Sequence, residues 1–256
     1  MICSANTNKG QKRSMNQDSY VIRRYTEKTY LCVVCDGMGG VKGGEEASQI
    51  ACEAFVETID NWITPYLKNR QKQIGTSEIK RVLIKGVDIA NEQVYLKSKQ
   101  NAAHKGMGTT MVAALVFDKT AFCLNVGDSR IYYLKGNFIE QITKDHSYVQ
   151  YLIDMGQLTP EEAENSSNKN IITRAIGTEI SVEPDLYMQK LDEGGFLLLC
   201  TDGLTNMVDD ATICDIVSSE KTKLDQIGLD LKTRILIDTA NENGGHDNIT
   251  AVLVRV

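Results

Sequence analysis

Four aspartates stand at the ends of apolar, strand-like runs, and they are the residues of this chain best placed to do chemistry. Asp36 follows TYLCVVC, Asp128 follows AFCLNVG, Asp202 follows GFLLLCT, and Asp247 comes just before ITAVLVRV. A strand buried on both faces reads as an unbroken apolar run, so the residue that ends it lies at the rim of the sheet. Strands that end together would therefore bring these carboxylates to one place.

Clustered carboxylates of this kind need a cation to balance their negative charge. Two full charges about 4 Å apart repel by roughly 4 kcal/mol at an effective dielectric of about 20, so bare carboxylates would take up protons. A bound cation removes this cost, and oxygen ligands alone favour a hard divalent ion, Mg²⁺ or Mn²⁺, over zinc or copper. Gly37, Gly39 and Gly40, which follow Asp36 closely, would let the backbone turn sharply and approach the ions.

Composition and charge exclude several classes of partner. The chain has 28 basic and 34 acidic residues, a net charge of −6 and no cationic stretch, which argues against nucleic acid. The apolar run Met111–Phe117 is far shorter than the roughly 20 residues that span a bilayer, and the polar N-terminus lacks a signal-peptide core. Seven cysteines without framework spacing indicate free thiols in a reducing compartment. We therefore expect a cytoplasmic protein that does not associate with membranes.

Apolar and β-branched runs predict the strands. They cover Ser19–Arg24, Thr29–Cys35, Thr109–Phe117, Ala121–Val126, Arg130–Lys135, Phe138–Gln141, Gly195–Thr201 and Ile249–Val256. Short turns at Asp118-Lys119 and at Lys135-Gly136-Asn137 join neighbouring strands, which favours antiparallel hairpins over crossover units.

Amphipathic helices separate the early strands from the later ones. Apolar stripes run over Ala47–Ile59 and Ile79–Val94, and later helices are predicted at Ala211–Ser218 and Leu224–Asn241. Grouped strands, grouped helices and hairpin connections predict an α+β fold with two antiparallel sheets packed face to face and helix pairs outside. Because no linker or internal repeat interrupts the chain, residues 1–256 are expected to form a single domain.

Short motifs occur along the chain in a specific order. They are GQKRSMNQD from Gly10, DGMGG from Asp36, GDSR from Gly127, TKDHS from Thr143, ITRAIG from Ile172, TDGL from Thr201 and DNIT from Asp247. A single Asp-Gly after a strand is usually an ordinary turn. The ordered set, spanning Asn8 to Val256, resembles the metal-dependent serine/threonine protein phosphatases of type 2C in their compact bacterial form. This resemblance implies a four-layer α-β-β-α sandwich with a metal centre between the sheet ends.

The resemblance also implies roles for single residues at the metal centre. Asp36 would bridge two ions, Mn²⁺ or Mg²⁺, and the Gly37 carbonyl would ligate one of them. Asp202 and Asp247 would hold the other ion. A water bridging both ions would attack the phosphorus in line, so no phosphoenzyme is needed. Asp128 would belong to a third, looser metal site.

Arg13 and Asp18 match the catalytic positions of the family. Arg13 would bind the phosphoryl group, for which a planar guanidinium suits two oxygens better than a lysine does. Asp18 would orient metal-bound water, with the capping of a turn as the alternative. A flap is expected at about 147–173, where the polar stretch Glu161–Asn170 would steer the choice of substrate. His146, at its entry, is expected to be structural.

The expected function is metal-dependent hydrolysis of phosphoserine and phosphothreonine in proteins. The expected protein is a monomer that acts on substrates of a bacterial Ser/Thr kinase and on the kinase itself. The alternative is a catalytically weak module that binds phosphoproteins in the same metal-loaded cleft. Val41 motivates this alternative, because bacterial relatives commonly have a histidine there, as a candidate acid for the leaving alkoxide. The retention of all four strand-end aspartates argues against it.

The cysteines and the two remaining histidines carry no catalytic signal. None of the seven cysteines has an arginine six positions later, the spacing that a cysteine-based phosphate loop requires. Cys32 and Cys35, three residues apart on a strand, would face opposite sides and are expected in the core. His104 and His246 stand alone and are expected to be exposed.

Val41→His tests whether this chain lacks the leaving-group acid at position 41. Phenolate leaves without a proton and an alkoxide scarcely does, so we expect the unmodified protein to favour aryl phosphates over phosphothreonine peptides. General acid catalysis is typically worth about 10²–10⁴-fold, so the substitution should raise peptide turnover more than aryl turnover. The measurement is the ratio of the two kcat/KM values on one preparation, and equal changes for both substrates would contradict the prediction.

Overall fold

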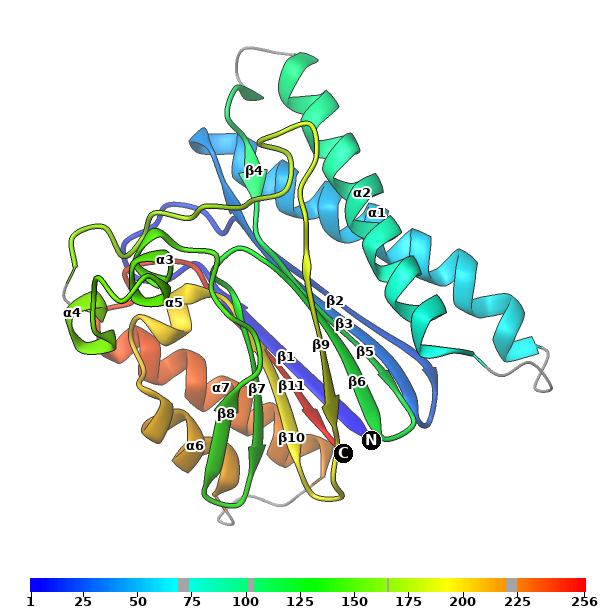
Figure 1. Ribbon diagram of the computed structural model, residues 1–256. Coiled ribbons are helices and arrows are strands. Elements are labelled where there is room, and N and C mark those ends of the chain that lie inside the picture. Colours follow the sequence, from blue (N-terminus) through cyan, green and yellow to red (C-terminus); the bar gives the residue numbers. More distant parts are fainter. Residues whose placement is uncertain (69–73, 101–103, 165, 220–224) are drawn as a thin grey trace.

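Two antiparallel sheets pack face to face, and helices cover their outer faces (Figure 1). The computed structural model describes residues 1–68, 74–100, 104–164, 166–219 and 225–256. One sheet has the order β1 (Ile2–Asn8), β11 (Ile249–Arg255), β10 (Phe196–Cys200), β7 (Arg130–Lys135), β8 (Phe138–Gln141). The other has the order β2 (Asp18–Thr26), β3 (Thr29–Met38), β5 (Met111–Phe117), β6 (Thr120–Val126), β9 (Asp185–Lys190), with β4 (Gly108–Thr109) paired to β3.

The helices form an outer layer on each sheet. The second sheet is covered by α1 (Gly40–Lys68) and α2 (Thr76–Gln100), and the first by α6 (Asp210–Ser218) and α7 (Gln226–Glu242), with the short α5 (Asp202–Thr205) at its end. The predicted α+β sandwich of two antiparallel sheets with helix pairs outside is therefore confirmed. No helix among the described residues is long and apolar enough to cross a membrane.

Alternation along β3 separates the apolar core into layers. Leu31, Val33 and Cys35 pack under α1 and α2, whereas Cys32 and Val34 pack between the two sheets. All five side chains are fully buried, as period-two alternation requires of a strand covered on both faces. The expectation that Cys32 and Cys35 lie in the core on opposite faces is confirmed.

The predicted strands differ from the observed ones where a strand is only partly buried or where its ladder is interrupted. β1 and β9 were not predicted, because both are edge strands whose residues are mostly half-buried and lack an apolar run. The predicted strand Thr109–Phe117 is interrupted at Thr110. The backbone N–H of Thr110 donates to the carbonyl of Asp36. The last helix starts at Gln226, and the predicted start at Leu224 lies outside the described residues.

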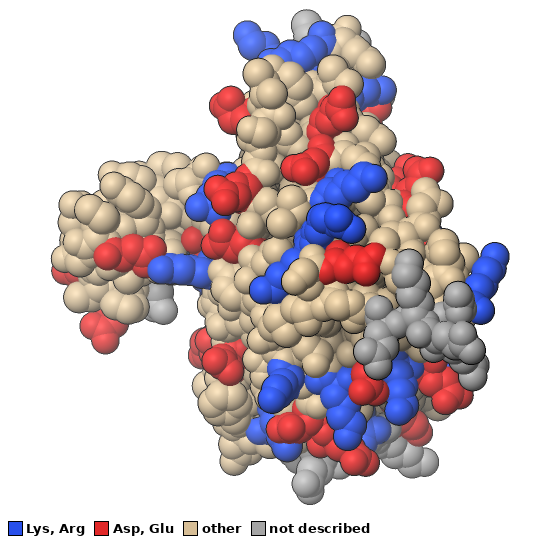
Figure 2. Space-filling model, turned by 45° about the vertical axis from the view of Figure 1, so that its right-hand side comes forward, with Lys and Arg blue, Asp and Glu red and all other residues tan. Residues whose placement is uncertain are grey.

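Residues 147–173 leave the sandwich between β8 and β9. They contain two short helices, α3 (Tyr148–Asp154) and α4 (Pro160–Glu164). Figure 2 shows this segment as a lobe that stands away from the body of the molecule. On the face drawn there, basic and acidic side chains are interspersed and do not form a single basic surface.

Gly203→Ala should disturb the contact between α5 and the start of β11. A Cβ at position 203 would lie 1.9 Å from the Asn248 carbonyl oxygen, so the backbone would have to shift, at a cost of about 1–3 kcal/mol. Thermal unfolding of the purified variant measures this loss. Gly75→Ala is the matched control, because a Cβ there meets nothing within 4 Å, and equal unfolding temperatures for the two variants would contradict the prediction.

Candidate metal centre

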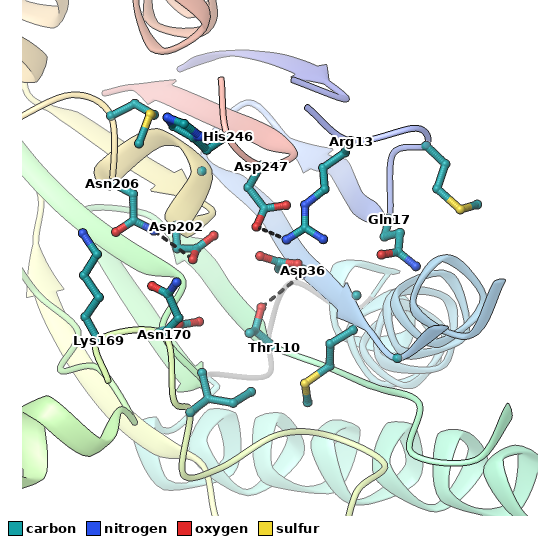
Figure 3. Close-up of a pocket in the computed structure, with 18 of the residues that line it drawn as sticks. Arg13, Gln17, Asp36, Thr110, Lys169, Asn170, Asp202, Asn206, His246 and Asp247 are labelled. Carbon is teal, nitrogen blue, oxygen red and sulfur yellow. Dashed lines mark hydrogen bonds and ion pairs between the residues drawn. The ribbon is translucent and has the colours of Figure 1, made fainter. Parts of the chain in front are cut away.

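The four strand-end aspartates lie around one cavity, where strands of both sheets end (Figure 3). Asp36 lies near the end of β3, and Asp202 is the first residue of α5, one residue beyond the end of β10. Asp128 lies in the turn where the chain crosses from β6 to β7 and so from one sheet to the other, and Asp247 lies just before β11. The cavity measures about 940 Å³ and is also lined by Arg13.

Strand register places Asp18 directly opposite Asp36. The two residues are Cα partners in the β2–β3 ladder. One carboxylate oxygen of Asp18, Oδ2, accepts hydrogen bonds from the hydroxyls of Thr201 (3.0 Å) and Thr250 (2.6 Å). The other, Oδ1, is buried and has no hydrogen-bond partner. Asp18 therefore does not cap a turn, and it lies opposite Asp36 with one unpartnered oxygen although it is not among the residues that line the cavity.

Thr110 fixes the backbone that carries Asp36. The N–H of Asp36 donates to the Thr110 hydroxyl (3.0 Å), and its carbonyl accepts from the N–H of Thr110 (2.9 Å). The same hydroxyl lies 2.7 Å from that of Ser129, the residue after Asp128. One threonine thus links the segments that carry two of the four aspartates.

Asn248 ties the loop that carries Arg13 to the last strand. Its side-chain amide donates to the carbonyls of Lys9 and Met15, both at 2.9 Å, and its Oδ1 accepts from the N–H of Gln17 (2.8 Å). Arg13 itself donates from Nη2 to Oδ2 of the neighbouring Asp247 (2.7 Å). This ion pair raises the pKa of Arg13 and places a guanidinium at the edge of the carboxylate cluster.

Burial and crowding favour protons on these carboxyls when no cation balances them. Burial is the largest cause, and it raises the pKa of Asp128 to about 8, that of Asp18 to about 7 and that of Asp202 to about 6. The pKa of Asp36 is raised well above its usual value by burial and then by Asp18. Since the folded state holds these protons more tightly, the metal-free fold loses stability as the pH rises from the ordinary aspartate range toward 8. A cation must displace the protons, so its apparent affinity rises with pH.

The donor set fits a hard divalent cation. The cavity presents carboxylate oxygens, and Oδ1 of Asp202, like Oδ1 of Asp18, is buried without a hydrogen-bond partner. As the side chains stand, no three Asp, Glu, His or Cys residues in the described parts of the chain converge closely enough to hold an ion. Two of the aspartates are engaged by neighbours, because Asp247 is bonded to Arg13 and Oδ2 of Asp202 accepts from Asn206 (3.0 Å).

The two stems of residues 147–173 are bonded to each other. The Thr173 N–H donates to the His146 carbonyl, and the Tyr148 N–H donates to the Ile171 carbonyl, both at 2.7 Å. The His146 ring is only 6% exposed, and its Nδ1 accepts from the N–H of Gly127 at 3.2 Å. The base of the segment is therefore attached to the turn that carries Asp128.

Arg174 and Asp185 complete this attachment. Arg174 Nη1 donates to Asp185 Oδ1 at 2.9 Å, and His146 Nε2 lies 3.3 Å from Asp185 Oδ2. Burial lowers the pKa of His146, and because Nδ1 accepts a hydrogen bond the neutral ring carries its proton on Nε2, toward Asp185. The network thus anchors the segment to β9 and gives His146 a structural role.

Several residues of the site were missed from the sequence. Thr201 and Thr250 sit inside the TDGL and DNIT motifs, and a hydroxyl beside a motif aspartate was the signal that could have found them. His246 is exposed, as expected, but it lines the cavity, and so do Lys169 and Asn206. The expectation for His104 was wrong, because its side chain is half-buried and lies 3.0 Å from Glu46. The structure does not describe the side chain of Val41, so the prediction for position 41 stays a prediction.

Comparison with known proteins agrees with this fold. The family described as Protein phosphatase 2C matches residues 7–226. Protein phosphatase PhpP of Streptococcus pneumoniae is 38% identical over 100% of this chain and 98% of its own length. The serine/threonine phosphatase of S. agalactiae has a TM-score of 0.85 at 37% identity, covering 100% of this chain and 99% of that one.

A further solved relative holds metal. The catalytic domain of the phosphatase PstP, solved in complex with two manganese ions, has a TM-score of 0.79 at 32% identity and covers 98% of this chain and 96% of that one. The present chain belongs to the protein phosphatase 2C family. It is a protein serine/threonine phosphatase, which confirms the function expected from the sequence.

Arg13→Ala should separate phosphate binding from metal binding. Loss of a charge-assisted contact to the phosphoryl group should lower kcat/KM by about 10²-fold. Metal affinity should not fall, because removing the guanidinium frees Asp247. Steady-state kinetics and metal titration measure the two effects, with Lys12→Ala as the control on the adjacent exposed residue. A parallel loss of metal affinity would show that Arg13 has a structural role only.

Proposed function

We propose that Asp36, the Gly37 carbonyl, Asp202 and Asp247 hold two divalent cations, Mn²⁺ or Mg²⁺, and that Asp128 contributes to a third site. The observation that carries this proposal is the single cavity lined by these aspartates, one of which, Asp202, has a buried carboxylate oxygen without a hydrogen-bond partner. Bound cations would neutralise the carboxylates and supply an acidified water for attack on phosphorus. The manganese found in the PstP relative supports the choice of metal.

The chain's own residues would position the phosphoryl group and its surroundings. Arg13 is half-exposed at the cavity edge, with side-chain exposure of 53%, and its guanidinium has further N–H groups beyond the one that Asp247 accepts. It would bind two phosphoryl oxygens. Asp18, fixed by two threonine hydroxyls, would orient water at the back of the site. Hydrolysis then needs no nucleophilic side chain.

The biological setting follows from the same reasoning. Phosphorylated proteins are the substrates of a protein phosphatase, and we propose that those of this chain include the targets of a bacterial Ser/Thr kinase and the kinase itself. We further propose a cytoplasmic monomer in which residues 1–256 form one domain and 147–173 act as its flap. Detection of the dephosphorylated kinase after incubation with the purified protein tests the partner.

Metal removal is the direct test of the cation sites. Activity toward an aryl phosphate should vanish in chelator and return with Mn²⁺, and less well with Mg²⁺. Asp36→Asn, Asp202→Asn and Asp247→Asn should each lose most of it. An ion that binds only the folded state stabilises it, by about 2.7 kcal/mol at one hundred times its Kd, so Mn²⁺ should also raise the unfolding temperature of the unmodified protein.

The controls distinguish the loss of metal binding from a general effect of substituting an aspartate. Asp215→Asn changes an exposed aspartate of α6 that does not line the cavity and should keep both activity and the thermal shift. Activity that persists after exhaustive chelation would rule out the proposed mechanism. An unchanged unfolding temperature at millimolar Mn²⁺ would rule out a preformed site.

A further inference from the structure

Cysteines from different elements meet in pairs inside the sandwich, and the proposed reaction does not use them. All seven cysteines are free thiols. Cys3 on β1 lies beside Cys32 on β3, and Cys35, near the end of β3, lies beside Cys52 on α1. Because two neighbouring thiols can be oxidised to a disulfide, what separates the pairs is whether an oxidant reaches them.

Strand alternation turns Cys3 toward the space between the two sheets. Its neighbour Ser4 faces the other way, where its hydroxyl lies 3.0 Å from that of Thr233 on α7. Cys3 packs against the apolar layer between the sheets, and Cys32 belongs to that layer. The Cys3 thiol is the first cause of the raised pKa of the Cys32 thiol, so the two side chains meet from opposite sheets.

A hydrogen bond beside this pair holds the same two segments together. The Tyr30 hydroxyl donates to the carbonyl of Met1 at 2.7 Å. Tyr30 and Cys32 are two residues apart on β3, and Met1 and Cys3 are two residues apart at the start of the chain. Residues two apart lie on the same face of a strand. The bond therefore aligns the start of β1 with β3 where the two thiols meet.

The two thiols of the pair differ in their access to solvent. Cys3 is half-buried, because β1 is an edge strand of its sheet. Cys32 is fully buried, and the Cys3 thiol and burial raise its pKa, so it reacts poorly with an oxidant by itself. Cys3 is therefore the thiol that meets an oxidant first, and Cys32 is the partner that resolves the oxidised form.

We propose that Cys3 and Cys32 form a reversible disulfide between the two sheets when the protein meets hydrogen peroxide. The Cys3 thiolate attacks one peroxide oxygen, which breaks the O–O bond and gives a sulfenic acid and hydroxide. The sulfur of Cys32 then attacks the sulfenic sulfur, the S–O bond breaks, and water leaves with the Cys32 proton. The two thiols lose two electrons in total, and hydrogen peroxide is reduced to water.

The second pair of thiols is closed to an oxidant. Cys35 and Cys52 belong to the layer under α1 and α2, and their exposed fractions are 0% and 2%. We therefore expect Cys35 and Cys52 to stay reduced, although their thiols are also neighbours. The two pairs share the contact between thiols and differ in access, so each serves as a comparison for the other.

The disulfide would fasten the strand that leads into the loop of Arg13. β1 ends at Asn8, and this loop follows it. β1 begins, at the N-terminus, at the end of the sandwich opposite to α5 (Figure 1), so the bond would form away from the aspartate cluster. A cross-link between residues 3 and 32 restricts the unfolded chain and would hold this edge strand to the other sheet.

Peroxide treatment followed by disulfide mapping tests the proposal. The reduced native protein, freed of reductant, is treated with hydrogen peroxide, and its remaining thiols are alkylated in denaturant. Tryptic digestion should give residues 1–9 linked to residues 29–42, with fragment masses that place the bond on Cys32 and not on Cys35. The count of free thiols should fall by two from the seven of the chain, and dithiothreitol should reverse both changes.

Matched variants identify the two sulfurs. Cys3→Ser and Cys32→Ala should each abolish the disulfide. Cys123→Ala should leave it intact, because Cys123 is also fully buried in the layer between the sheets, where burial alone raises the pKa of its thiol.

Unfolding in urea gives a second readout on the unmodified protein. The oxidised form should unfold at a higher urea concentration than the reduced form, because the cross-link restricts the unfolded chain. Cys3→Ser should unfold at the same concentration after either treatment.

Three outcomes would overturn the proposal. They are a disulfide between Cys35 and Cys52 in place of the expected one, Cys3 oxidised without a bond to Cys32, and an oxidised form that unfolds at the same or a lower urea concentration. None of these measurements uses phosphatase activity, so their result is independent of the proposed metal mechanism.

Discussion

The burial of several carboxylates around one cavity is the constraint on which the rest of the site depends. Burial raises the pKa of Asp18, Asp36, Asp128 and Asp202, so the fold brings together groups that cannot all be ionised without a counter-charge. The surrounding bonds serve to hold them in spite of this cost. Threonine hydroxyls support Asp18, Thr110 holds the Asp36 backbone, and the guanidinium at the cavity edge pairs with the remaining aspartate. The cost of ionising these carboxylates falls on this one cluster, and a divalent cation would remove it by balancing their charge.

Much of the sandwich could be predicted from the sequence, because its central strands are covered on both faces. Arg130–Lys135 and Phe138–Gln141 match observed strands end to end, since sharp turns bound them. β1 and β9 escaped prediction because edge strands mix polar and apolar residues. The aspartates were identifiable because each interrupts an apolar run. By contrast, the link from Asn248 to the loop of residues 9–17 depends on contacts between distant parts of the chain, which a local pattern does not contain.

Residues from the segment 147–173 line both the metal cavity and the cavity beside it. Its stems pair with each other and with β9, so its position depends on the sandwich and not on its own packing, and α3 has no fully buried residue. A short helix without a core cannot be predicted from apolar periodicity. A base bonded to the sandwich and a helix with no buried residue would let the sequence of this segment change without disturbing the aspartate cluster.

The ladder between β1 and β11 has a consequence for when the protein becomes active. Arg13 and Asp247 are 234 positions apart, and both segments are held by Asn248 and by the pairing of β1 with β11. During synthesis the N-terminal strand emerges long before its partner, so the cavity cannot close until the last strand has left the ribosome. Until β11 has been made, Arg13 and Asp247 cannot pair, so the two sides of the cavity meet only late in synthesis.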